Sequence, residues 1–545
     1  MKKKITSVLI CLACMAGGLT ASAQGTTYFL ATESHGDGDG SSWENAMGVD
    51  DLKTIVESFE EGNTYCFMEG TYKAVAMTVP QGAIIKGGFA KTSTGTDISK
   101  ATPFTTPTVF DADIDGDGNG DNLTNSLLFI DAEKLGADSK TTTVCGIKII
   151  NATYTGTTRD GSVLHGHACK IVFRDCTFEG SKNATEGGVL YVNKADLTVK
   201  NCVWKDNYSD KNPVCLKSNT GGAGNGVIVL DGCSFTGNTC KTDWATSSNG
   251  KHGGMIGFKG EALYIVNCTA DGNGFQLNNN GAFVRNDASL PLFMAYNTVV
   301  NYYTMNTKNA YGQMASIAKD TPLYMVGNIM VNKEDNTAND SKFGCVYLQA
   351  GTGTDNVKDG GYNYIGGLFQ SGKNYNIAET DVLNATTASV FGSSTPEVKT
   401  AVNGALYIAP AADLRAIDTN AAAAAASAWK YSETAPTLEA LGIDLTKDIC
   451  GNTRPATTVS GAYDLNATSG TTSIADIAAC EGNMIKSLGN ARYSVTGKGT
   501  VTVADIAGHV MMTADMAKGC IVDLSSYPKG IYLIAAGGKC VKVVR

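Results

Sequence analysis

The middle of the chain repeats one short pattern of apolar and polar positions. Apolar residues alternate with others over four positions and a polar residue follows, as in Leu197, Val199 and Asn201. A period of two residues is typical of a β-strand that buries one face. The pattern returns at intervals of 24–35 residues up to position 363. A unit this short cannot bury its own apolar face, so we expect the copies to stack as the coils of a parallel β-helix.

The residue that ends each copy forms a second pattern. Eight copies end at positions 151, 175, 201, 232, 267, 297, 328 and 363, and six of these residues are asparagine. Asparagine tolerates the left-handed backbone of a sharp corner and can hydrogen-bond to nearby backbone. Stacked coils would place these amides above one another. The predicted asparagine ladder consists of Asn151, Asp175, Asn201, Asn267, Asn297, Asn328 and Asn363.

Four cysteines follow these corners by one residue. Cys176, Cys202, Cys233 and Cys268 occupy the same place in successive copies. Cysteine packs readily as a small apolar side chain, so the pattern favours a column inside the coils. Disulfides within this set are one alternative, because an exported chain with many cysteines can use them as a framework. Zinc is the other alternative, although the four cysteines contain no tight C-x-x-C pair.

Both ends of such a β-helix need a cover, because open strand edges pair with other chains. Leu52, Ile55, Val56 and Phe59 are spaced as on one face of a helix, and we expect an N-terminal capping helix there. Residues 420–446 combine an alanine run with a helical apolar pattern. We expect this segment to form a helix and a loop that pack on the C-terminal coils.

Motifs at both ends of this region resemble those of a known group of exported proteins. They are GSSWENA at 40–46, EGTY at 69–72, IKGGF at 85–89, D-x-x-G-x-x-R at 448–454 and GAY at 461–463. Over about residues 26–465 the chain resembles the pectin-lyase-like superfamily and the chlamydial polymorphic outer-membrane repeats. The resemblance implies a mainly β protein with a right-handed parallel β-helix. Enzymes of this superfamily cleave polysaccharides, either as lyases with a Lys or Arg base beside calcium or as hydrolases with paired carboxylates.

A polar break after Leu465 precedes a separate C-terminal unit. Residues 466–545 contain short apolar strands and turns, which favours a small antiparallel β-sandwich. This unit resembles the C-terminal sorting domain of the type IX secretion system of Bacteroidetes. The resemblance implies export by that secretion machinery across the outer membrane, and a generic accessory sandwich is the alternative. The matching residues are Asp505, Gly508, Asp523, Lys529, Gly530, Tyr532, Lys542 and Arg545.

The first residues have the pattern of a secretory signal peptide. Residues 2–4 are lysines, an apolar stretch follows, and residues 21–23 form an A-x-A cleavage site. The predicted organisation is a signal peptide (1–23), a β-helix with its capping helix (24–465) and a secretion and sorting sandwich (466–545). A membrane or lipid anchor at the start is the alternative. No later stretch approaches the ~18 apolar residues that a membrane helix needs.

The net charge of the chain fits an extracellular location. The net charge is −9, and it becomes −12 when the three leader lysines are removed. A nucleic-acid partner would need a basic stripe, which we do not find in the sequence, so no nucleic-acid partner is expected. We expect a protein that is secreted or held at the outer-membrane surface.

An acidic loop is the one candidate for a cofactor site. Residues 113–121 read DIDGDGNGD. Carboxylates at the first, third and fifth positions can converge on a hard cation, and glycine permits the turn. The candidate calcium ligands are Asp113, Asp115, Asp117 and Asp121. Thr124 stands where an EF-hand has glutamate, so a helical EF-hand is not expected, and a solvated acidic turn is the alternative.

The sequence contains no complete catalytic set of the superfamily. His165 and His167 share one face of a strand, yet nothing near them in the sequence completes a metal site. Aromatic residues in the middle coils could stack on sugar rings or cover the core. They are Trp204, Tyr208, Trp244, Tyr302, Tyr303 and Tyr311.

We therefore expect a β-helix that binds a glycan or another surface partner without cleaving it. The alternative is a polysaccharide lyase or a glycoside hydrolase. That alternative depends on fold analogy, which does not fix function, and the sequence leaves the question of catalysis open.

Overall fold

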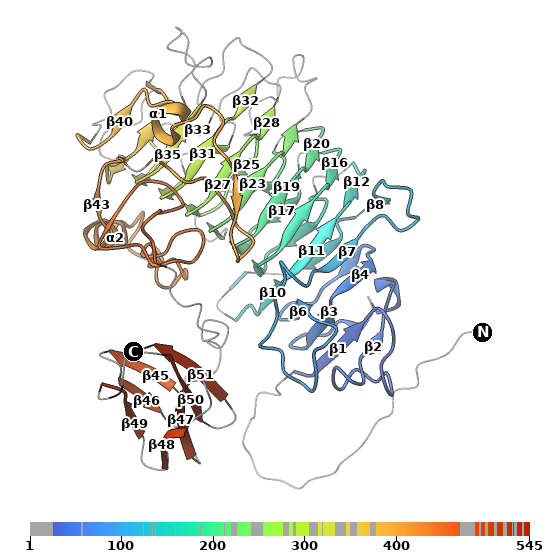
Figure 1. Cartoon of the computed structure of the whole chain (residues 1–545). Helices are drawn as coiled ribbons and strands as arrows, with labels where there is room; N and C mark the ends of the chain where they lie inside the picture. The colour runs from blue at the N-terminus through green and yellow to red at the C-terminus, as the bar shows by residue number, and fades with distance from the viewer. Residues whose placement is uncertain are drawn as a thin grey trace.

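Four parallel sheets make up most of the structure. The computed structural model describes residues 25–468 and 485–544 with gaps, the longer ones at 220–225, 241–253, 276–282, 305–313, 333–344, 349–356 and 371–377. Within these residues the parallel sheets have 12, 11, 10 and 7 strands (Figure 1). We name them sheets A, B, C and D in that order.

The strands of each sheet follow in their spatial order. Sheet A contains β2 (Met47–Gly48), β1 (Thr27–Ala31), β3 (Thr64–Met68), β6 (Ile84–Phe89), β10 (Thr141–Cys145), β14 (Lys170–Arg174), β18 (Asp196–Lys200), β22 (Val227–Asp231), β26 (Ala262–Val266), β30 (Leu292–Ala295), β34 (Leu323–Val326) and β37 (Val357–Asp359). Sheet B contains β4 (Gly70–Lys73), β7 (Thr108–Asp111), β11 (Ile147–Ile150), β15 (Thr177–Glu179), β19 (Val203–Lys205), β23 (Ser234–Thr236), β27 (Thr269–Asp271), β31 (Thr298–Val300), β35 (Ile329–Val331), β38 (Tyr364–Ile365) and β40 (Val382–Leu383).

Sheet C and, in the middle coils, sheet D complete the turn of the chain. Sheet C contains β5 (Met77–Thr78), β9 (Leu128–Asp131), β13 (Leu164–His167), β17 (Leu190–Asn193), β21 (Leu216–Ser218), β25 (Ile256–Phe258), β29 (Val284–Asn286), β33 (Ala315–Ile317), β36 (Val346–Leu348) and β39 (Leu368–Gln370). Sheet D contains β8 (Asn122–Leu123), β12 (Thr153–Tyr154), β16 (Lys182–Asn183), β20 (Tyr208–Ser209), β24 (Thr239–Cys240), β28 (Gly274–Phe275) and β32 (Tyr303–Thr304).

The chain passes through these sheets in the same order in the middle coils, from β10 to β33. Strands β10, β11, β12 and β13 lie in sheets A, B, D and C, and β14 then pairs with β10 in sheet A. Parallel strands joined in this way make right-handed crossovers in nearly all proteins. The predicted mainly β fold, a right-handed parallel β-helix, is confirmed.

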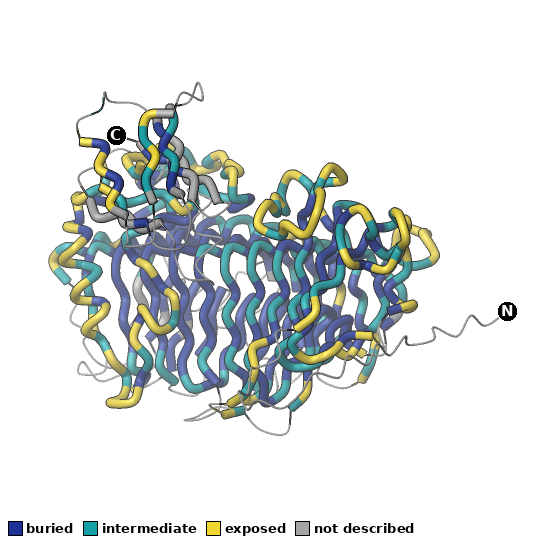
Figure 2. Tube along the Cα trace, turned by 90° about the horizontal axis from the view of Figure 1, so that it is seen from below, coloured by how far each residue is buried: buried dark blue, intermediate teal, exposed yellow. Residues whose placement is uncertain are grey.

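Alternating side chains fill the interior of the coils. In β18, Leu197 and Val199 are buried while Asp196, Thr198 and Lys200 face outward. The buried strands line up along the axis of the helix in Figure 2. Their inward side chains form one apolar core that extends from the first coil to the last.

A sharp corner joins sheet A to sheet B in every middle coil. Asp175, Asn201, Gly232, Asn267 and Tyr296 occupy this corner with φ between 50° and 64°. This left-handed conformation suits asparagine, aspartate and glycine. The turn directs the next side chain into the interior.

The residues after this corner form a single column inside the coils. Strand register places each of them beside the next along the axis. The column contains Ile147, Cys176, Cys202, Cys233, Cys268, Asn297, Asn328, Asn363 and Asp381. The cysteines are buried and free, so interior packing is confirmed and no disulfide joins them.

The column changes from thiols to amides at Asn297. The Cys268 N–H donates to Asn297 Oδ1 at 3.0 Å. Asn297 Nδ2 donates to Asn328 Oδ1 at 2.9 Å, and Asn328 Nδ2 donates to Asn363 Oδ1 at 3.0 Å. Each amide also satisfies buried backbone groups, because Asn328 Nδ2 donates to the carbonyl of Met294 at 3.0 Å.

A second asparagine ladder lies at the corner between sheets B and D. Asn207 Nδ2 donates to Asn238 Oδ1 and Asn238 Nδ2 donates to Asn273 Oδ1, both at 2.8 Å. All three side chains are fully buried. The Gly-Asn pairs at 237–238 and 272–273 mark this ladder in the sequence, since each glycine provides the left-handed corner.

The seven residues of the predicted ladder therefore do not form one stack. Asn297, Asn328 and Asn363 lie in the inner column, whereas Asp175, Asn201 and Asn267 are the left-handed residues one position earlier. Asn151 lies at the other corner, between sheets B and D. The single-ladder prediction was wrong in register, because the apolar pattern shifts by one residue from β30 onward.

The outward corner residues hold a later segment of the chain, which we call the strap (residues 417–464). Arg454 is buried in it, its guanidinium lies 4.2 Å from the centre of the Tyr296 ring, and its Nη2 donates to Asn267 Oδ1 at 3.0 Å. Arg454 also donates to the carbonyls of Gly461 and Ala462. The D-x-x-G-x-x-R and GAY motifs thus fasten the strap to the corner between sheets A and B.

The strap covers the outer face of sheet A. It contains β43 (Ile417–Asp418), α2 (Thr419–Ala428) and β44 (Thr457–Thr458). Trp429 packs against Tyr264, Phe293 and Tyr324, which form a row on that face. The predicted helix and loop are present, and they make the outer positions of β26, β30 and β34 as apolar as the inner ones. The preceding segment contains α1 (Thr387–Phe391), β41 (Lys399–Thr400) and β42 (Leu406–Tyr407).

The N-terminal cap differs from its prediction. The structure has a 3-10 helix, η1 (Leu52–Thr54), where we expected an amphipathic α-helix. Asp51 pairs with Lys73 as an isolated bridge, which holds the start of η1 against sheet B. Val56 lies outside the described residues, but Leu52, Ile55 and Phe59 are buried in the main core, so this segment still closes the first coil.

The C-terminal unit consists of two antiparallel sheets. One contains β45 (Ile485–Gly489), β46 (Arg492–Val495) and β49 (Cys520–Asp523). The other contains β48 (Val510–Asp515), β47 (Thr500–Asp505), β50 (Ile531–Ala536) and β51 (Lys539–Val544). Val495 and Val522 from the first sheet pack with Val503 and Ile534 from the second. This shared core makes the unit a small β-sandwich, as predicted.

The inner column ends in two carboxyl groups. Asp381 Oδ1 accepts hydrogen bonds from the N–H of Asn363 at 2.8 Å and from its Nδ2 at 3.2 Å. Asp381 Oδ2 is buried without a donor among the described residues, and Asp359 lies beside it. Burial and the neighbouring Asp359 raise the pKa of Asp381 to about 8. A proton between the two carboxyl groups supplies the missing donor.

We predict that Asn238→Ala lowers the free energy of unfolding by at least about 3 kcal/mol, because it leaves several buried polar groups without partners. Urea denaturation followed by circular dichroism measures the change. Asn420→Ala makes the same substitution at an exposed site on α2 and should stay within about 0.5 kcal/mol of the parent. Equal effects of the two substitutions would show that the ladder does not stabilise the coils.

We predict that Asp381→Asn removes a pH dependence of stability. The pKa of Asp381 in the folded chain, about 8, exceeds its ordinary value of 3.8. Its contribution is therefore complete below about pH 4 and is lost as the pH rises through 8. The amide can accept from Asn363 and donate to Asp359 at every pH.

Urea midpoints at pH 5 and pH 9 test this prediction. The variant should match the parent at pH 5 and exceed its stability at pH 9 by on the order of 4 kcal/mol, since each pH unit between 5 and the folded pKa of about 8 carries about 1.4 kcal/mol. Asp37→Asn, at an exposed position, is the control. A variant that loses as much stability as the parent between the two pH values contradicts the shared proton.

Candidate functional site

One row of side chains on the outer face of sheet C combines aromatic, imidazole and basic groups. In β13, Leu164 and Gly166 face the core while His165 and His167 face outward. Strand register extends the row through His165 along the axis in both directions. The sheet C row consists of Phe129, His165, Tyr191, Lys217, Gly257 and Arg285. We include in it Asp131 and His167, which pair in register two residues further along β9 and β13 on the same face.

Each histidine in β13 contacts an aspartate through Nδ1. His167 Nδ1 lies 2.8 Å from Asp131 Oδ1. His165 Nδ1 hydrogen-bonds to Asp160 Oδ1, and the hydroxyl of Tyr154 donates to Asp160 Oδ2 at 2.9 Å. Since an ionised carboxylate only accepts, Nδ1 carries the proton in both rings. Each Nε2 of a neutral ring is then left with its lone pair.

Two aromatic rings hold His165 in place. Its ring centre lies 4.8 Å from that of Phe129 and 5.3 Å from that of Tyr191. These three residues come from neighbouring strands of sheet C, β9, β13 and β17. The ring of His165 therefore has a fixed position as well as a fixed tautomer.

Exposure changes along the row. The side chains of Asp131 and His167 are 50% and 33% exposed, and those of His165 and Asp160 are 21% and 15% exposed. Lys217 and Arg285 are buried further along the same row. The accessible part of the row is therefore the part on β9 and β13.

The sequence alone identified the two histidines but not their carboxylate partners. Asp131 lies 36 residues before His167 and becomes its neighbour only through the pairing of β9 with β13. Asp160 precedes β13 by a short loop. The strand pattern could have indicated Asp131, since it ends β9 at the position that matches His167.

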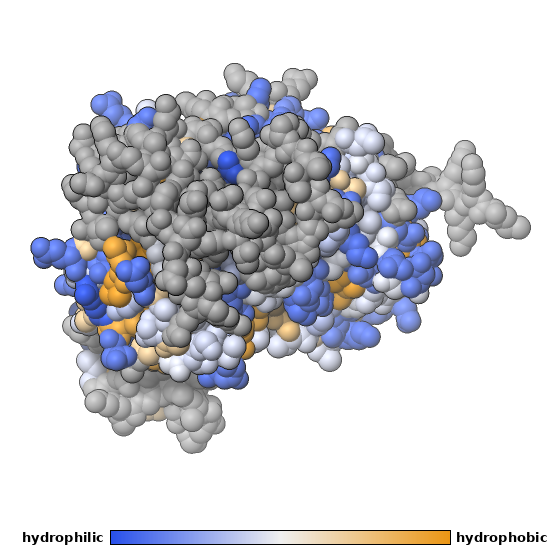
Figure 3. Space-filling model, turned by 90° about the horizontal axis from the view of Figure 1, so that it is seen from above, coloured by the Kyte–Doolittle hydropathy of each residue, from blue (hydrophilic) through white to orange (hydrophobic). Residues whose placement is uncertain are grey.

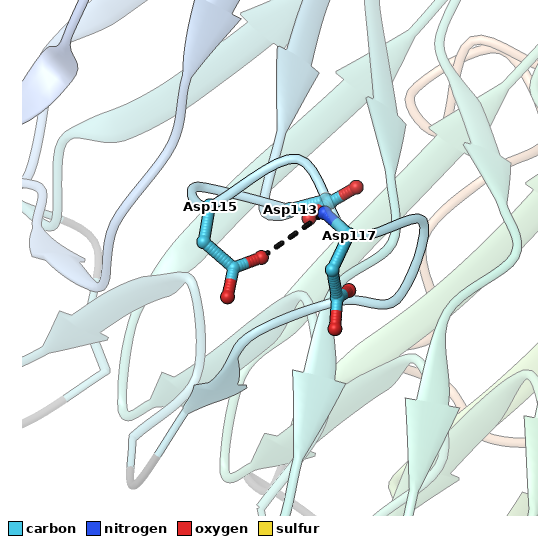
Figure 4. Close-up of side chains that lie close together, drawn as sticks. All are labelled: Asp113, Asp115 and Asp117. Atoms are coloured by element: carbon cyan, nitrogen blue, oxygen red, sulfur yellow. Dashed lines mark hydrogen bonds between the residues drawn. The ribbon is translucent and has the colours of Figure 1, made fainter.

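The acidic loop follows β7 and brings three of its four predicted ligands together. Carboxylate oxygens of Asp113, Asp115 and Asp117 lie within 4.8 Å of one another (Figure 4). Asp115 Oδ1 accepts from the N–H of Asp117 at 3.1 Å. Asp121 folds back to the other end of the loop, where Oδ2 accepts from the N–H of Ile114 at 2.5 Å.

Glycine permits the tight turn of this loop. Gly118 has a φ of 86°, and its N–H donates to Asp113 Oδ2 at 2.9 Å. Asp113 Oδ1 accepts from the N–H of Gly116 at 2.9 Å. Three carboxylates this close to one another can act together on a hard cation such as calcium.

The aromatic residues that we considered for sugar stacking lie in different environments. Trp204 is fully buried and stacks on Phe235 at 4.6 Å, and Tyr302 is also buried, so both belong to the core. Tyr208 is half-buried in sheet D and donates to Asp210 Oδ1 at 3.1 Å. The side chain of Tyr303 and the whole of Trp244 and Tyr311 lie outside the described residues.

The predicted sorting residues are only partly described. Asp505 ends β47 opposite Tyr532, which is buried in β50. Asp523 ends β49, accepts from the N–H of Ser525 at 2.9 Å and pairs with Arg492 at 3.5 Å. Lys542 lies in β51. Gly508, Lys529, Gly530 and Arg545 lie outside the described residues, as does the predicted signal peptide.

The described surface and helices add two observations. Among the described residues visible in Figure 3, hydrophilic side chains cover much of the surface. No helix in the described part of the chain is long and apolar enough to span a membrane.

Comparisons with known proteins give one similarity. No protein-family model matches the chain, and no curated protein matches it. Among solved structures the chain is similar to the pectate lyase Pel9A, with 14% sequence identity and a TM-score of 0.34. The similar region covers 77% of this chain and 96% of that one. The assignment of the fold depends on the four parallel sheets of the chain itself.

Proposed function

We propose that this protein is a secreted or cell-surface β-helix that binds a polysaccharide along the outer face of sheet C without cleaving it. The observation that carries this proposal is the accessible part of the sheet C row on β9 and β13. Phe129 and His165 pair in register on β9 and β13, and His167 lies two residues beyond His165 on the same face. Such strands are about 4.8 Å apart, so the two strands offer contacts at neighbouring positions along an extended chain.

The chemistry of these side chains suits a sugar polymer. Aromatic rings pack against the apolar faces of sugars, and imidazole and carboxylate groups hydrogen-bond to hydroxyls. Asp131 and the two histidines provide both donors and acceptors at the exposed end of the row.

We infer the extracellular location of the protein from the sequence motifs at the two ends of the chain. The lysine-rich start, the apolar stretch and the A-x-A site support export through a signal peptide. The motifs of residues 505–545 and the antiparallel sandwich that contains them support recognition by the type IX secretion machinery. An extracellular location would bring the protein into contact with polysaccharides.

We also propose that the acidic loop binds one calcium ion. Asp113, Asp115 and Asp117 would supply the ligands, and their carboxylates already lie within 4.8 Å of one another. Asp121, the fourth predicted residue, would shape the loop through its contact with the N–H of Ile114. The role of the ion would be to hold the loop that joins sheets B and D.

Affinity gel electrophoresis tests the binding proposal. The chain from residue 24 onward should be retarded by at least one member of a panel of acidic and neutral polysaccharides. Phe129→Ala and His167→Ala should each weaken the retardation about tenfold, which corresponds to about 1.4 kcal/mol. Lys148→Ala, on the outer face of sheet B, is the matched control and should bind like the parent.

The same mixtures distinguish binding from catalysis. New reducing ends would replace the proposal with a glycoside hydrolase, and new unsaturated ends would replace it with a polysaccharide lyase. Binding that both sheet C variants retain would place the site on another surface. A chain that no polysaccharide retards would favour a protein partner.

Calorimetry and thermal unfolding test the calcium proposal. We expect one calcium ion per chain and a gain of about 2.7 kcal/mol in stability at a calcium concentration of 100 times Kd. Asp115→Asn with Asp117→Asn should abolish both effects. Asp206→Asn, which is exposed, should preserve them. Identical unfolding in calcium and in chelator would contradict the proposal.

A further inference from the structure

The two histidine–aspartate pairs on β13 and its neighbours have an arrangement that polysaccharide binding does not require. We propose that His165 and His167 bind one divalent first-row transition-metal ion of the copper or zinc type through their Nε2 atoms. The proposal depends on the register of sheet C and on two hydrogen bonds. It is independent of whether a polysaccharide binds.

The first support is the orientation of the rings. A histidine that ligates a metal commonly donates its other ring N–H to a carboxylate, which fixes the tautomer and raises the basicity of the ligand. Both rings show this contact, His165 with Asp160 and His167 with Asp131. In both cases the contact uses Nδ1, so Nε2 of each ring is left to bind a metal ion.

The second support is the spacing. His165 and His167 are two residues apart in β13, so both project from one face of the sheet. Their Cα atoms are then about 7 Å apart. Side chains stand roughly perpendicular to a sheet, so the two imidazoles can approach one ion from neighbouring positions.

The third support is the balance of rigidity and access. Phe129 and Tyr191 fix the ring of His165 from both sides, whereas the side chain of His167 is 33% exposed. Solvent can therefore reach the pair, and water or another oxygen ligand would complete the coordination.

Local charge and ligand type select the class of ion. The carboxylates of Asp131 and Asp160 lie behind the two rings and offset a double positive charge. Imidazole nitrogen suits copper, zinc and nickel, while calcium and magnesium prefer oxygen. The histidine site and the acidic loop of residues 113–121 should therefore bind different metals.

Copper and zinc titrations of the untagged chain from residue 24 onward test the proposal. In separate titrations, calorimetry should show one Cu²⁺ per chain or one Zn²⁺ per chain, bound at the same site. The electron paramagnetic resonance spectrum of the copper complex should show two equivalent nitrogen ligands. Zn²⁺ is included because it does not oxidise thiols, and free thiols are counted before and after each titration.

Substitutions distinguish the two proposed metal ligands from the two aspartates that orient them. His165→Gln and His167→Gln should each weaken binding at least tenfold, and the double variant should abolish it. Asp131→Asn and Asp160→Asn should weaken it about 10–100-fold by releasing the rings. His35→Gln is the control, since His35 Nδ1 faces the carbonyl of Trp43, in the first coils.

If the variants at His165 disturb folding, the variants at the more exposed His167 and Asp131 still test the proposal. His167 and Asp131 are the most exposed members of the two pairs, and circular dichroism checks that their variants fold. Unchanged affinity in His167→Gln, a spectrum with one nitrogen or none, or loss of binding in His35→Gln would each overturn the proposal. Binding that is tenfold weaker in His167→Gln and in Asp131→Asn, but intact in His35→Gln, would support it.

Discussion

The corner between sheets A and B is the constraint on which the rest of the structure depends. Each middle coil must turn sharply there with a residue in the left-handed conformation, and the following residue must fill the interior beside its neighbour in the next coil. Thiols meet this need with apolar packing. Asparagines meet it by hydrogen bonding, since each amide joins the next amide and a buried backbone carbonyl. The coils stay in register because neither column tolerates a slip of one residue.

The register that the interior fixes also determines which residues are neighbours on the outer surface. Because the middle coils repeat the same corner, outward residues far apart in the sequence fall into straight rows. Asp131 and His167 become partners in this way, as do the rings of Phe129, His165 and Tyr191. The same regularity lets Arg454 reach the outward corner residues, so the strap attaches where the backbone is most constrained.

The fold could be predicted from the sequence because a period of two and a repeated corner leave few alternatives. The register of the later coils could not. In β18 the inward positions are apolar and the outward ones polar, so the pattern reveals which face is buried. In β30 and β34 both faces are apolar, because the strap covers Phe293 and Tyr324. A one-residue shift leaves such a pattern unchanged, and the ladder was assigned to the wrong column for that reason.

The candidate site was only partly predictable for the opposite reason. Repetition constrains the residues that face inward and leaves the outward ones free, so a chemical site appears as a local departure from the repeat. His165 and His167 are such a departure, in outward positions of a strand whose inward residues, Leu164 and Gly166, keep to the pattern. Their partners depend on strand pairing and on one loop, and neither is visible from local spacing. In a solenoid of this kind, function is therefore best sought where outward polar residues of neighbouring strands contact one another in register.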